Sequence, residues 1–262
     1  MRDDDLHFLE PAPLPGGGAP RSLAYRRVRG TGPGVVWLGG FKSDMDSTKA
    51  VALDGWARRA GRAFLRFDYS GHGRSGGNFA EGTIGLWFAD ALAMVRAETE
   101  GPQILVGSSM GGWIALLVAR ALAEAGEAER LAGMVLIAPA VDFTEALMWA
   151  QFTPEIRHTI ETEGQWMRPT DYAPEPYAVT KALIEDGRRH LLLDKPVRAH
   201  APVHILQGMR DPDVPWQHAM LLVEHLTHDP VSVTLIKDAD HRQSRPEDID
   251  RLIRAVEAIA TG

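Results

Sequence analysis

The sequence contains no cysteine among its 262 residues. Disulfide bridges, thiolate metal sites and a cysteine nucleophile are therefore excluded. It also lacks an uninterrupted apolar run of the length that spans a bilayer. The longest apolar stretch, Ile104–Ala119, is broken by two serines and three glycines, a pattern that indicates a strand followed by a buried helix. We therefore expect no stable insertion into a membrane.

The sequence has fewer basic residues than acidic ones. The 28 lysines and arginines are outnumbered by 35 aspartates and glutamates, which gives a formal net charge of −7 at pH 7. General nucleic-acid binders carry a basic stripe, so a nucleic acid is not expected as a partner. The first six residues lack the apolar stretch of a signal peptide, and they do not form a basic amphipathic leader. These absences predict a cytoplasmic protein.

Apolar runs rich in β-branched residues alternate with helical patterns along most of the chain. Continuous hydrophobicity in the runs favours parallel strands buried on both faces, and the alternation predicts a doubly wound sheet in a single domain spanning residues 1–262. Strands are expected at about 6–9, 21–29, Val35–Leu38, Ala63–Phe67, Ile104–Val106, Met134–Ile137, Val203–Gln207 and Val231–Ile236. Helices are expected at about 48–61, 83–99, 111–126, 216–227 and 246–260.

One segment, from about residue 141 to 195, breaks this alternation. It has helical patterns at Phe143–Ala150, Pro154–Glu163 and Tyr177–Leu193, and no strand pattern. We expect it to form a helical cap over the carboxyl ends of the strands, where open α/β sheets bind their ligands. Its large apolar side chains would pack the cap onto the body, and some would line an acyl pocket. They are Leu147, Met148, Trp149, Phe152, Trp166, Met167 and Tyr172.

A short glycine- and serine-rich motif links one predicted strand to one predicted helix. Residues 107–111 read Gly-Ser-Ser-Met-Gly, and G-x-S-x-G in this position is typical of a sharp turn that exposes one serine. Small residues are needed beside such a strained turn, which explains the outer glycines. Only Ser109 has glycine both two residues before it and two residues after it, which favours it over Ser108. Ser109 is the predicted nucleophile.

A serine hydroxyl needs a base that takes its proton and usually an acid that orients this base. In this architecture the acid and then the histidine follow the serine along the chain. His241 lies in the loop after the last predicted strand, from which an imidazole can reach the top of the sheet. Two candidate acids follow the preceding strand: Asp211, which comes first and which we favour, and Asp213, whose alternative role is to cap the next helix.

The oxyanion formed during acyl transfer needs two preorganised hydrogen-bond donors. The predicted pair is the backbone N–H of Met110, which follows the nucleophile, and that of Phe41, which lies in the loop after Val35–Leu38. The sequence has no phosphate-binding glycine motif, and Asp68 and His72 are not joined by further residues at metal-ligand spacing. We therefore expect neither a cofactor nor a metal.

Five strings carry a family resemblance. They are Gly-Gly-Phe-Lys-Ser-Asp-Met at 39–45, Arg-Phe-Asp-Tyr-Ser-Gly-His-Gly-Arg-Ser at 66–75, the segment 101–113, Gly-Met-Arg-Asp-Pro-Asp-Val-Pro-Trp at 208–216 and Asp-His-Arg at 240–242. From about residue 34 to 255 the chain resembles the α/β-hydrolase superfamily, and within it the mitochondrial palmitoyl-protein thioesterases that also cleave acyl glucuronides. The resemblance implies a mostly parallel central sheet flanked by helices, with a helical lid. It also implies ester or thioester cleavage by Ser109, Asp211 and His241.

The leading hypothesis is a serine hydrolase that cleaves carboxylic ester or thioester bonds through an acyl-serine intermediate. Its substrate would be a small acyl ester or thioester, or an S-acylated protein. The same residues would serve an acyltransferase or a cofactor-free perhydrolase, because the sequence does not distinguish water from another acyl acceptor. A non-catalytic ligand receptor is the third possibility. Five side chains of the predicted cap either hold an anionic substrate group or form a solvated face: Arg157, Arg168, Arg188, Arg189 and His190.

Overall fold

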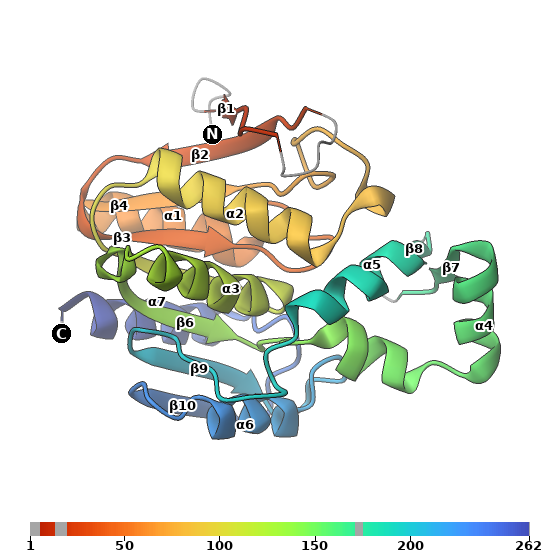
Figure 1. Cartoon of the computed structure of the whole chain (residues 1–262). Helices are drawn as coiled ribbons and strands as arrows, with labels where there is room; N and C mark the ends of the chain where they lie inside the picture. The colour runs from red at the N-terminus through yellow and green to blue at the C-terminus, as the bar shows by residue number, and fades with distance from the viewer. Residues whose placement is uncertain (1–5, 14–19, 171–174, 262) are drawn as a thin grey trace.

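The computed structural model describes residues 6–13, 20–170 and 175–261, which build an eight-stranded sheet in the order β1-β2-β4-β3-β5-β6-β9-β10 (Figure 1). The pairings from β4 to β10 are parallel, whereas β1 and β2 extend one edge in antiparallel fashion. The strands are β1 His7–Leu9, β2 Leu23–Val28, β3 Thr31–Leu38, β4 Arg62–Phe67, β5 Gln103–Ser108, β6 Leu131–Ile137, β9 Val203–Gly208 and β10 Val231–Ile236. The predicted α/β fold with a mostly parallel sheet is confirmed.

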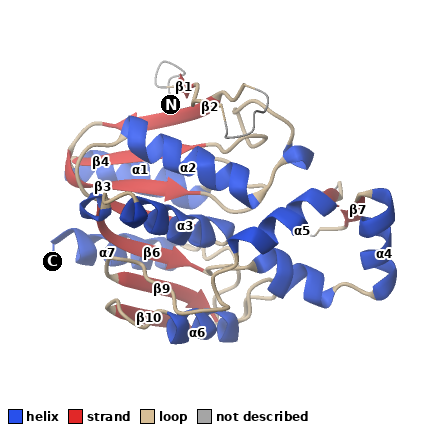
Figure 2. Cartoon of the chain, viewed as in Figure 1, coloured by secondary structure: helices blue, strands red, loops and turns tan. Residues whose placement is uncertain are grey.

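Helices cover both faces of this sheet (Figure 2). The packing of buried side chains places α1 and α7 on one face, and α2, α3 and α6 on the other. Their bounds, close to the predicted ones, are α1 Thr48–Ala60, α2 Ile84–Glu98, α3 Met110–Glu124, α6 Trp216–His225 and α7 Pro246–Thr261. None of the helices in the described part of the chain is both long and apolar enough to cross a bilayer.

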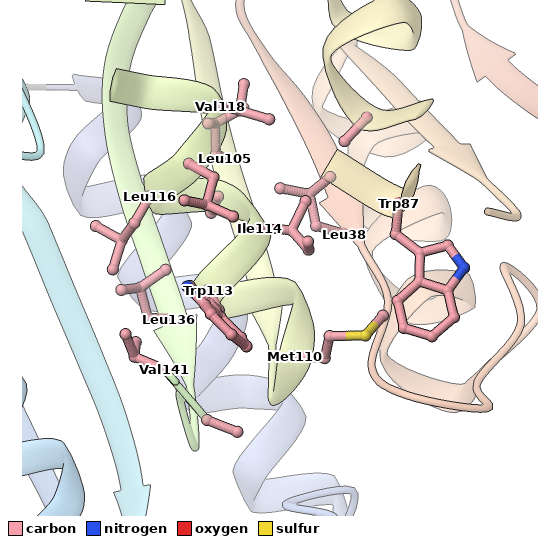
Figure 3. Packing of buried hydrophobic residues seen from close by; sticks show 14 of the residues in the cluster. Leu38, Trp87, Leu105, Met110, Trp113, Ile114, Leu116, Val118, Leu136 and Val141 are labelled. Carbon is pink, nitrogen blue, oxygen red and sulfur yellow. The ribbon is translucent and has the colours of Figure 1, made fainter. Parts of the chain in front are cut away.

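The central strands bury both of their faces. Val35 and Ile104 point into the cluster under α1 and α7, while the adjacent Val36 and Leu105 point into the cluster under α2 and α3. Successive side chains of a strand face opposite ways, so a strand covered on both sides reads as a continuous apolar run. In Figure 3 the side chain of Trp113 on α3 lies in the second of these clusters. The turn between β5 and α3 therefore rests on a rigid base.

The chain leaves the sheet between β6 and β9, and we call residues 138–202 the β6–β9 segment. It projects beyond the carboxyl ends of the strands in Figure 1. Its elements are a π-helical turn Thr144–Met148, a 3₁₀ turn Trp149–Gln151, α4 Pro154–Glu163, β7 Gln165–Arg168, β8 Tyr177–Thr180, α5 Lys181–Gly187 and a 3₁₀ turn Arg188–His190. Helical structure is thus present close to where the first two predicted helices were expected.

Two predictions for this segment were wrong. A helix was expected over Tyr177–Leu193, but helix α5 begins only at Lys181, because the Thr180 hydroxyl caps it by accepting a hydrogen bond from the Leu183 N–H at 3.1 Å. No strand was expected, but β7 and β8 pair in antiparallel fashion. Each of these strands has 4 residues, which is too short a stretch to show a clear alternation of polar and apolar side chains in the sequence. Tyr172, one of the predicted lining residues, lies outside the described residues.

Candidate active site

Ser109 occupies a strained turn between β5 and α3, at the carboxyl end of the sheet. Its backbone has φ 55° and ψ −118°, a conformation that residues other than glycine rarely adopt. Its N–H donates to the carbonyl of Ile137, the last residue of the neighbouring strand β6, at 2.8 Å. Such a conformation costs on the order of 1–3 kcal/mol and persists only where the surroundings enforce it. Here the packed strands and helix α3 enforce it.

The two outer glycines of the motif make this turn sterically possible. A Cβ atom on Gly107 would lie 2.3 Å from the carbonyl oxygen of Gly111, and one on Gly111 would lie 2.0 Å from the carbonyl oxygen of Leu38. Both distances are far shorter than a van der Waals contact. Any side chain at either position would push α3 away from the sheet, which agrees with the reason given for these glycines from the sequence.

A chain of hydrogen bonds joins the three residues singled out from the sequence. His241 Nε2 lies 3.1 Å from Ser109 Oγ, and His241 Nδ1 lies 2.7 Å from Asp211 Oδ2. An ionised carboxylate only accepts, so Nδ1 carries the imidazole proton and Nε2 accepts from the serine hydroxyl. Ser109 follows β5, Asp211 follows β9 and His241 follows β10. Parallel strands bring these three loops to the same edge of the sheet.

Asp211 is held more firmly than Asp213. The side chain of Asp211 is fully buried, and its Oδ1 accepts the backbone N–H groups of Asp213 at 2.9 Å and Val214 at 2.8 Å. Asp213 is exposed. The capping role considered for Asp213 is wrong, since the N-cap position of α6 is Pro215, which makes no side-chain capping hydrogen bond. The structure therefore directs the first of the two aspartates at the histidine.

The same residues also offer the geometry of a metal site. Ligand atoms of Asp211, Asp213 and His241 lie within 4.8 Å of one another. However, both carboxylate oxygens of Asp211 already accept hydrogen bonds, and His241 bridges Asp211 and Ser109. Binding a metal through these atoms would break that chain of hydrogen bonds.

A cavity of about 580 Å³ opens beside Ser109. This volume is in the range of small-molecule sites. The β6–β9 segment supplies an apolar part of its wall through Phe143, Leu147 and Met148, with the ring of Tyr177 beside them. Two of the apolar residues expected to line a pocket, Leu147 and Met148, thus do so.

The loop after β3 runs against the serine turn. A Cβ atom on Gly40 would lie 3.3 Å from the carbonyl oxygen of Ser108 and 3.4 Å from Cβ of Ser109, so little space separates the two backbones. Phe41 and Met110, the predicted oxyanion donors, both line the cavity. The Phe41 ring also makes edge contacts, which immobilise it, with Phe79, Trp87, Phe143 and Tyr177.

His72 holds this loop in place, a role that the sequence did not reveal. Its Nε2 accepts the backbone N–H of Lys42 at 3.2 Å, and its Nδ1 lies 3.3 Å from the carbonyl oxygen of Ser70. Lys42 has a φ of 59°, so its conformation needs such support. Burial lowers the pKa of His72 to about 4, which keeps the imidazole neutral and able to accept. The only sequence signal was its place between two glycines after a predicted strand.

We expect His72→Gln to make the stability of the protein less sensitive to acid. The pKa of His72 falls from 6.5 to about 4 on folding, so the unfolded chain takes up this proton first as the pH drops. His72 therefore destabilises the fold progressively as the pH falls from 6.5 toward 4, by about 1–2 kcal/mol at pH 5. Urea unfolding at pH 7 and pH 5 should show a smaller loss for the variant. An equal loss in both proteins would contradict the proposed burial of a neutral imidazole.

Five cationic side chains were candidates for an anion contact, and in the structure Arg168 alone of these five lines the cavity. Arg157 donates to the carbonyls of Trp149 and Ala150. The remaining three bind acidic side chains. Arg188 pairs with Glu145, and both Arg189 and His190 pair with Asp186. Four of the five side chains thus contact other groups of the protein and do not line the cavity.

Two lysines of the cavity wall were not singled out from the sequence. Lys42 Nζ lies 5.6 Å from the ring centre of Phe79 and 5.2 Å from that of Tyr177, which is cation–π distance. Lys49 is buried beneath the loop that carries His241. Both line the same cavity as Phe41, the residue that the sequence suggested as an oxyanion donor. A lysine in a loop or a first helical turn has no pattern that marks it as part of a site.

The topology and the serine turn together define the class of protein. A mostly parallel sheet flanked by helices, with G-x-S-x-G after a central strand, is the architecture of α/β hydrolases. Residues 35–172 match the model of the family described as serine aminopeptidase, S33, and the chain belongs to this family of α/β hydrolases. It is accordingly a hydrolase.

Individual proteins with known names or structures are similar to this chain over most of its length. The chain is 38% identical over 253 residues to the palmitoyl-protein thioesterase ABHD10, mitochondrial, of Mus musculus, covering 96% of this chain and 81% of that protein. The solved structure of α/β hydrolase domain-containing protein 10 from mouse matches with a TM-score of 0.86 and 36% identity over 97% of each chain. A protein from Agrobacterium vitis S4 matches with a TM-score of 0.91 and 45% identity, over 97% of this chain and 98% of that one.

The predicted cytoplasmic location is wrong by the same comparison. The relatives from mouse, rat, cattle and human are all named mitochondrial. The prediction depended on the composition of the first residues alone. Targeting signals are recognised by import receptors, and the compartment of a protein is therefore independent of how its hydrolase domain folds.

Proposed function

We propose that this chain is a serine hydrolase in which Ser109 is the nucleophile, His241 the general base and Asp211 the orienting acid. The observation that carries the proposal is the continuous hydrogen-bond chain through these three side chains. His241 Nε2 takes the hydroxyl proton as Ser109 Oγ attacks the acyl carbon, and then gives it to the leaving group. Water then attacks the acyl carbon of the acyl-serine while His241 Nε2 takes its proton. His241 returns this proton to Ser109 Oγ as the bond between Oγ and the acyl carbon breaks, which releases the acyl group as a carboxylic acid.

The oxyanion of the tetrahedral intermediate is proposed to bind the backbone N–H groups of Phe41 and Met110. Three observations support this pair. Both residues line the cavity beside Ser109. Met110 is the first residue of α3, where N–H groups have no partner within the helix and the helix dipole favours negative charge. The close approach at Gly40 brings the Phe41 backbone toward the serine.

The proposed substrate is a small acyl ester or thioester, or an S-acylated protein, and residues 141–195 are proposed to act as a cap on a single hydrolase domain. The apolar wall formed by Phe143, Leu147 and Met148 suits an acyl chain. The names of the relatives favour a thioester, since they are described as palmitoyl-protein thioesterases. We propose acyl-thioester cleavage as the main activity.

A matched pair of substrates tests this choice. We expect the octanoyl thioester to be cleaved with a higher kcat/KM than the octanoyl ester of the corresponding alcohol. The two substrates share the acyl group and differ only in the leaving atom, so the comparison isolates the preference for sulfur or oxygen. The Ser109→Ala variant serves as the blank. A preference for the oxygen ester would mean that the protein is a carboxylesterase and not a thioesterase. Cleavage of neither substrate above the blank would refute the proposed activity on simple acyl chains.

A further inference from the structure

The loop that carries His241 is anchored to the sheet by a buried glutamine. Gln243, with a φ of 43°, donates from Nε2 to the carbonyl oxygen of Leu206 on β9 at 3.2 Å. Its backbone N–H donates to Asp240 Oδ1 at 3.1 Å. On the other side of the histidine, the carbonyl of Ala239 accepts the N–H of Arg210 at 3.0 Å. These bonds tie the loop to β9 and to the loop that carries Asp211.

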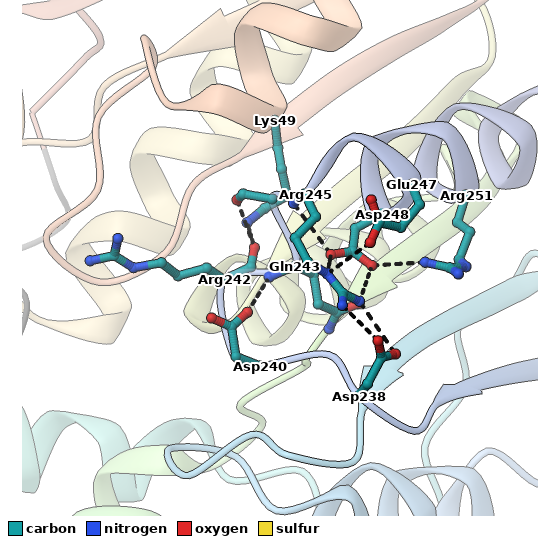
Figure 4. Close-up of polar contacts among 10 residues, drawn as sticks. Lys49, Asp238, Asp240, Arg242, Gln243, Arg245, Glu247, Asp248 and Arg251 are labelled. Carbon is teal, nitrogen blue, oxygen red and sulfur yellow. Dashed lines mark hydrogen bonds and ion pairs between the residues drawn. The ribbon is translucent and has the colours of Figure 1, made fainter.

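A second anchor comes from a different layer of the fold. Lys49, in the first turn of α1, is only 9% exposed, and its ammonium donates to the carbonyl oxygen of Arg242, the residue directly after His241. Figure 4 shows Lys49 reaching from α1 toward this loop. The two residues are 193 positions apart in the chain. Burying a charged ammonium costs free energy unless it is both hydrogen-bonded and paired with opposite charge. The hydrogen bond to Arg242 therefore needs acidic groups nearby.

Acidic groups supply that compensation. Asp240, in the histidine loop, and Asp248, in the first turn of α7, attract the ammonium of Lys49, while Arg242 repels it. Asp248 is itself held by Arg245 at 2.8 Å and by Arg251 at 2.9 Å. The ammonium thus lies where α1, α7 and the histidine loop meet.

We propose that Lys49 is a positioning residue of the hydrolytic reaction, which fixes the histidine loop so that His241 Nε2 stays within hydrogen-bond distance of Ser109. The inference rests on the proposed function of the site. Gln243 holds the loop from the β9 side and Lys49 holds it from the α1 side, so the backbone that carries His241 cannot shift away from the serine without breaking one of these two bonds. Without Lys49, the carbonyl of Arg242 would lose this partner.

The anchor depends on pH within an accessible range. Burial lowers the pKa of Lys49 to about 8, and this effect outweighs the attraction of Asp240 and Asp248. As the pH rises through this value the ammonium becomes a neutral amine, its hydrogen bond to Arg242 loses its charge, and the attraction to both aspartates ends. Activity should therefore decline on the alkaline side of pH 8 through a group other than His241.

Three variants test the proposal: Lys49→Met, which removes the charge; Lys49→Arg, which keeps it at every pH used; and Arg251→Met, a control that disturbs Asp248 without touching Arg242. The measurements are kcat and KM on the octanoyl thioester from pH 6 to 10, the rate of Ser109 labelling by a fluorophosphonate, and Tm. We expect Lys49→Met to lower kcat and the labelling rate by about tenfold to a hundredfold with little change in KM, as a displaced catalytic group would.

The pH profile separates positioning from general stability. The alkaline decline near pH 8 should vanish in Lys49→Met and shift upward in Lys49→Arg. At pH 7, Arg251→Met should keep the kcat and labelling rate of the unmodified protein, because the bond from Lys49 to Arg242 stays intact. Unchanged kcat and labelling in Lys49→Met would overturn the proposal, as would a loss of equal size in Arg251→Met or a loss confined to KM. Should Lys49→Arg not fold, the profile of Lys49→Met still decides. Absence of labelling in the unmodified protein is a separate result, because it would refute the proposed function itself.

Discussion

Ser109→Ala should lose activity by about 10⁵–10⁶-fold in kcat, the scale seen when a serine nucleophile is removed. The loss would be this large because the hydroxyl that His241 Nε2 contacts in the cavity belongs to Ser109. The fold should survive, since alanine keeps the Cβ atom and the backbone bond to Ile137 is unaffected. The free energy of unfolding is expected to change by less than about 1 kcal/mol. Steady-state kinetics and urea unfolding measure the two quantities.

Ser108→Ala is the matched control for this experiment. Ser108 is the adjacent residue, is largely buried and ends strand β5, but its side chain lacks the His241 contact that Ser109 makes. A fluorophosphonate should add its mass to the unmodified protein and to Ser108→Ala, but not to Ser109→Ala. If Ser109→Ala retained turnover, or if it were labelled as fast as the unmodified protein, the assignment of the nucleophile would be wrong.

Asp211→Asn is expected to lower kcat by about 10⁴-fold while leaving the fold intact. An asparagine oxygen can still accept the backbone N–H groups of Asp213 and Val214. Its NH₂ group, however, would donate to His241 Nδ1 where the carboxylate accepts now. The imidazole proton would then move to Nε2, which could no longer take a proton from Ser109. Kinetics at saturating substrate measures this loss directly.

Asp213→Asn distinguishes the two aspartates that the sequence left open. Asp213 is exposed and contributes its backbone N–H to Asp211, a bond that this substitution keeps. We expect its effect on kcat to stay well below that of Asp211→Asn. Losses of equal size in the two variants would mean that the carboxylates share the orienting role, and a larger loss in Asp213→Asn would reverse the assignment.

Short-range sequence patterns were sufficient to predict most strands of the main sheet and the turn that carries Ser109. The continuous apolar runs predicted β5 and β6 because a strand buried on both faces has no polar side. The glycines at 107 and 111 predicted the serine turn because the clash that excludes larger residues there is local. The same reasoning missed β7 and β8, which pair with each other although they are not adjacent in the chain, and it expected helix where Tyr177–Thr180 is extended.

The sequence by itself determined the order of the main-sheet strands and of the helices that flank them, the turn at Ser109 and the candidates for its partners. Each of these depends on residues that are near one another in the chain. The tertiary structure decided which candidates meet. His241 and Ser109 are 132 positions apart and contact only because parallel strands end at the same edge. It also separated Asp211 from Asp213, joined His72 to Lys42, and brought Lys49 to the histidine loop. Such contacts depend on how helices and strands pack, and no short-range pattern of residues encodes them.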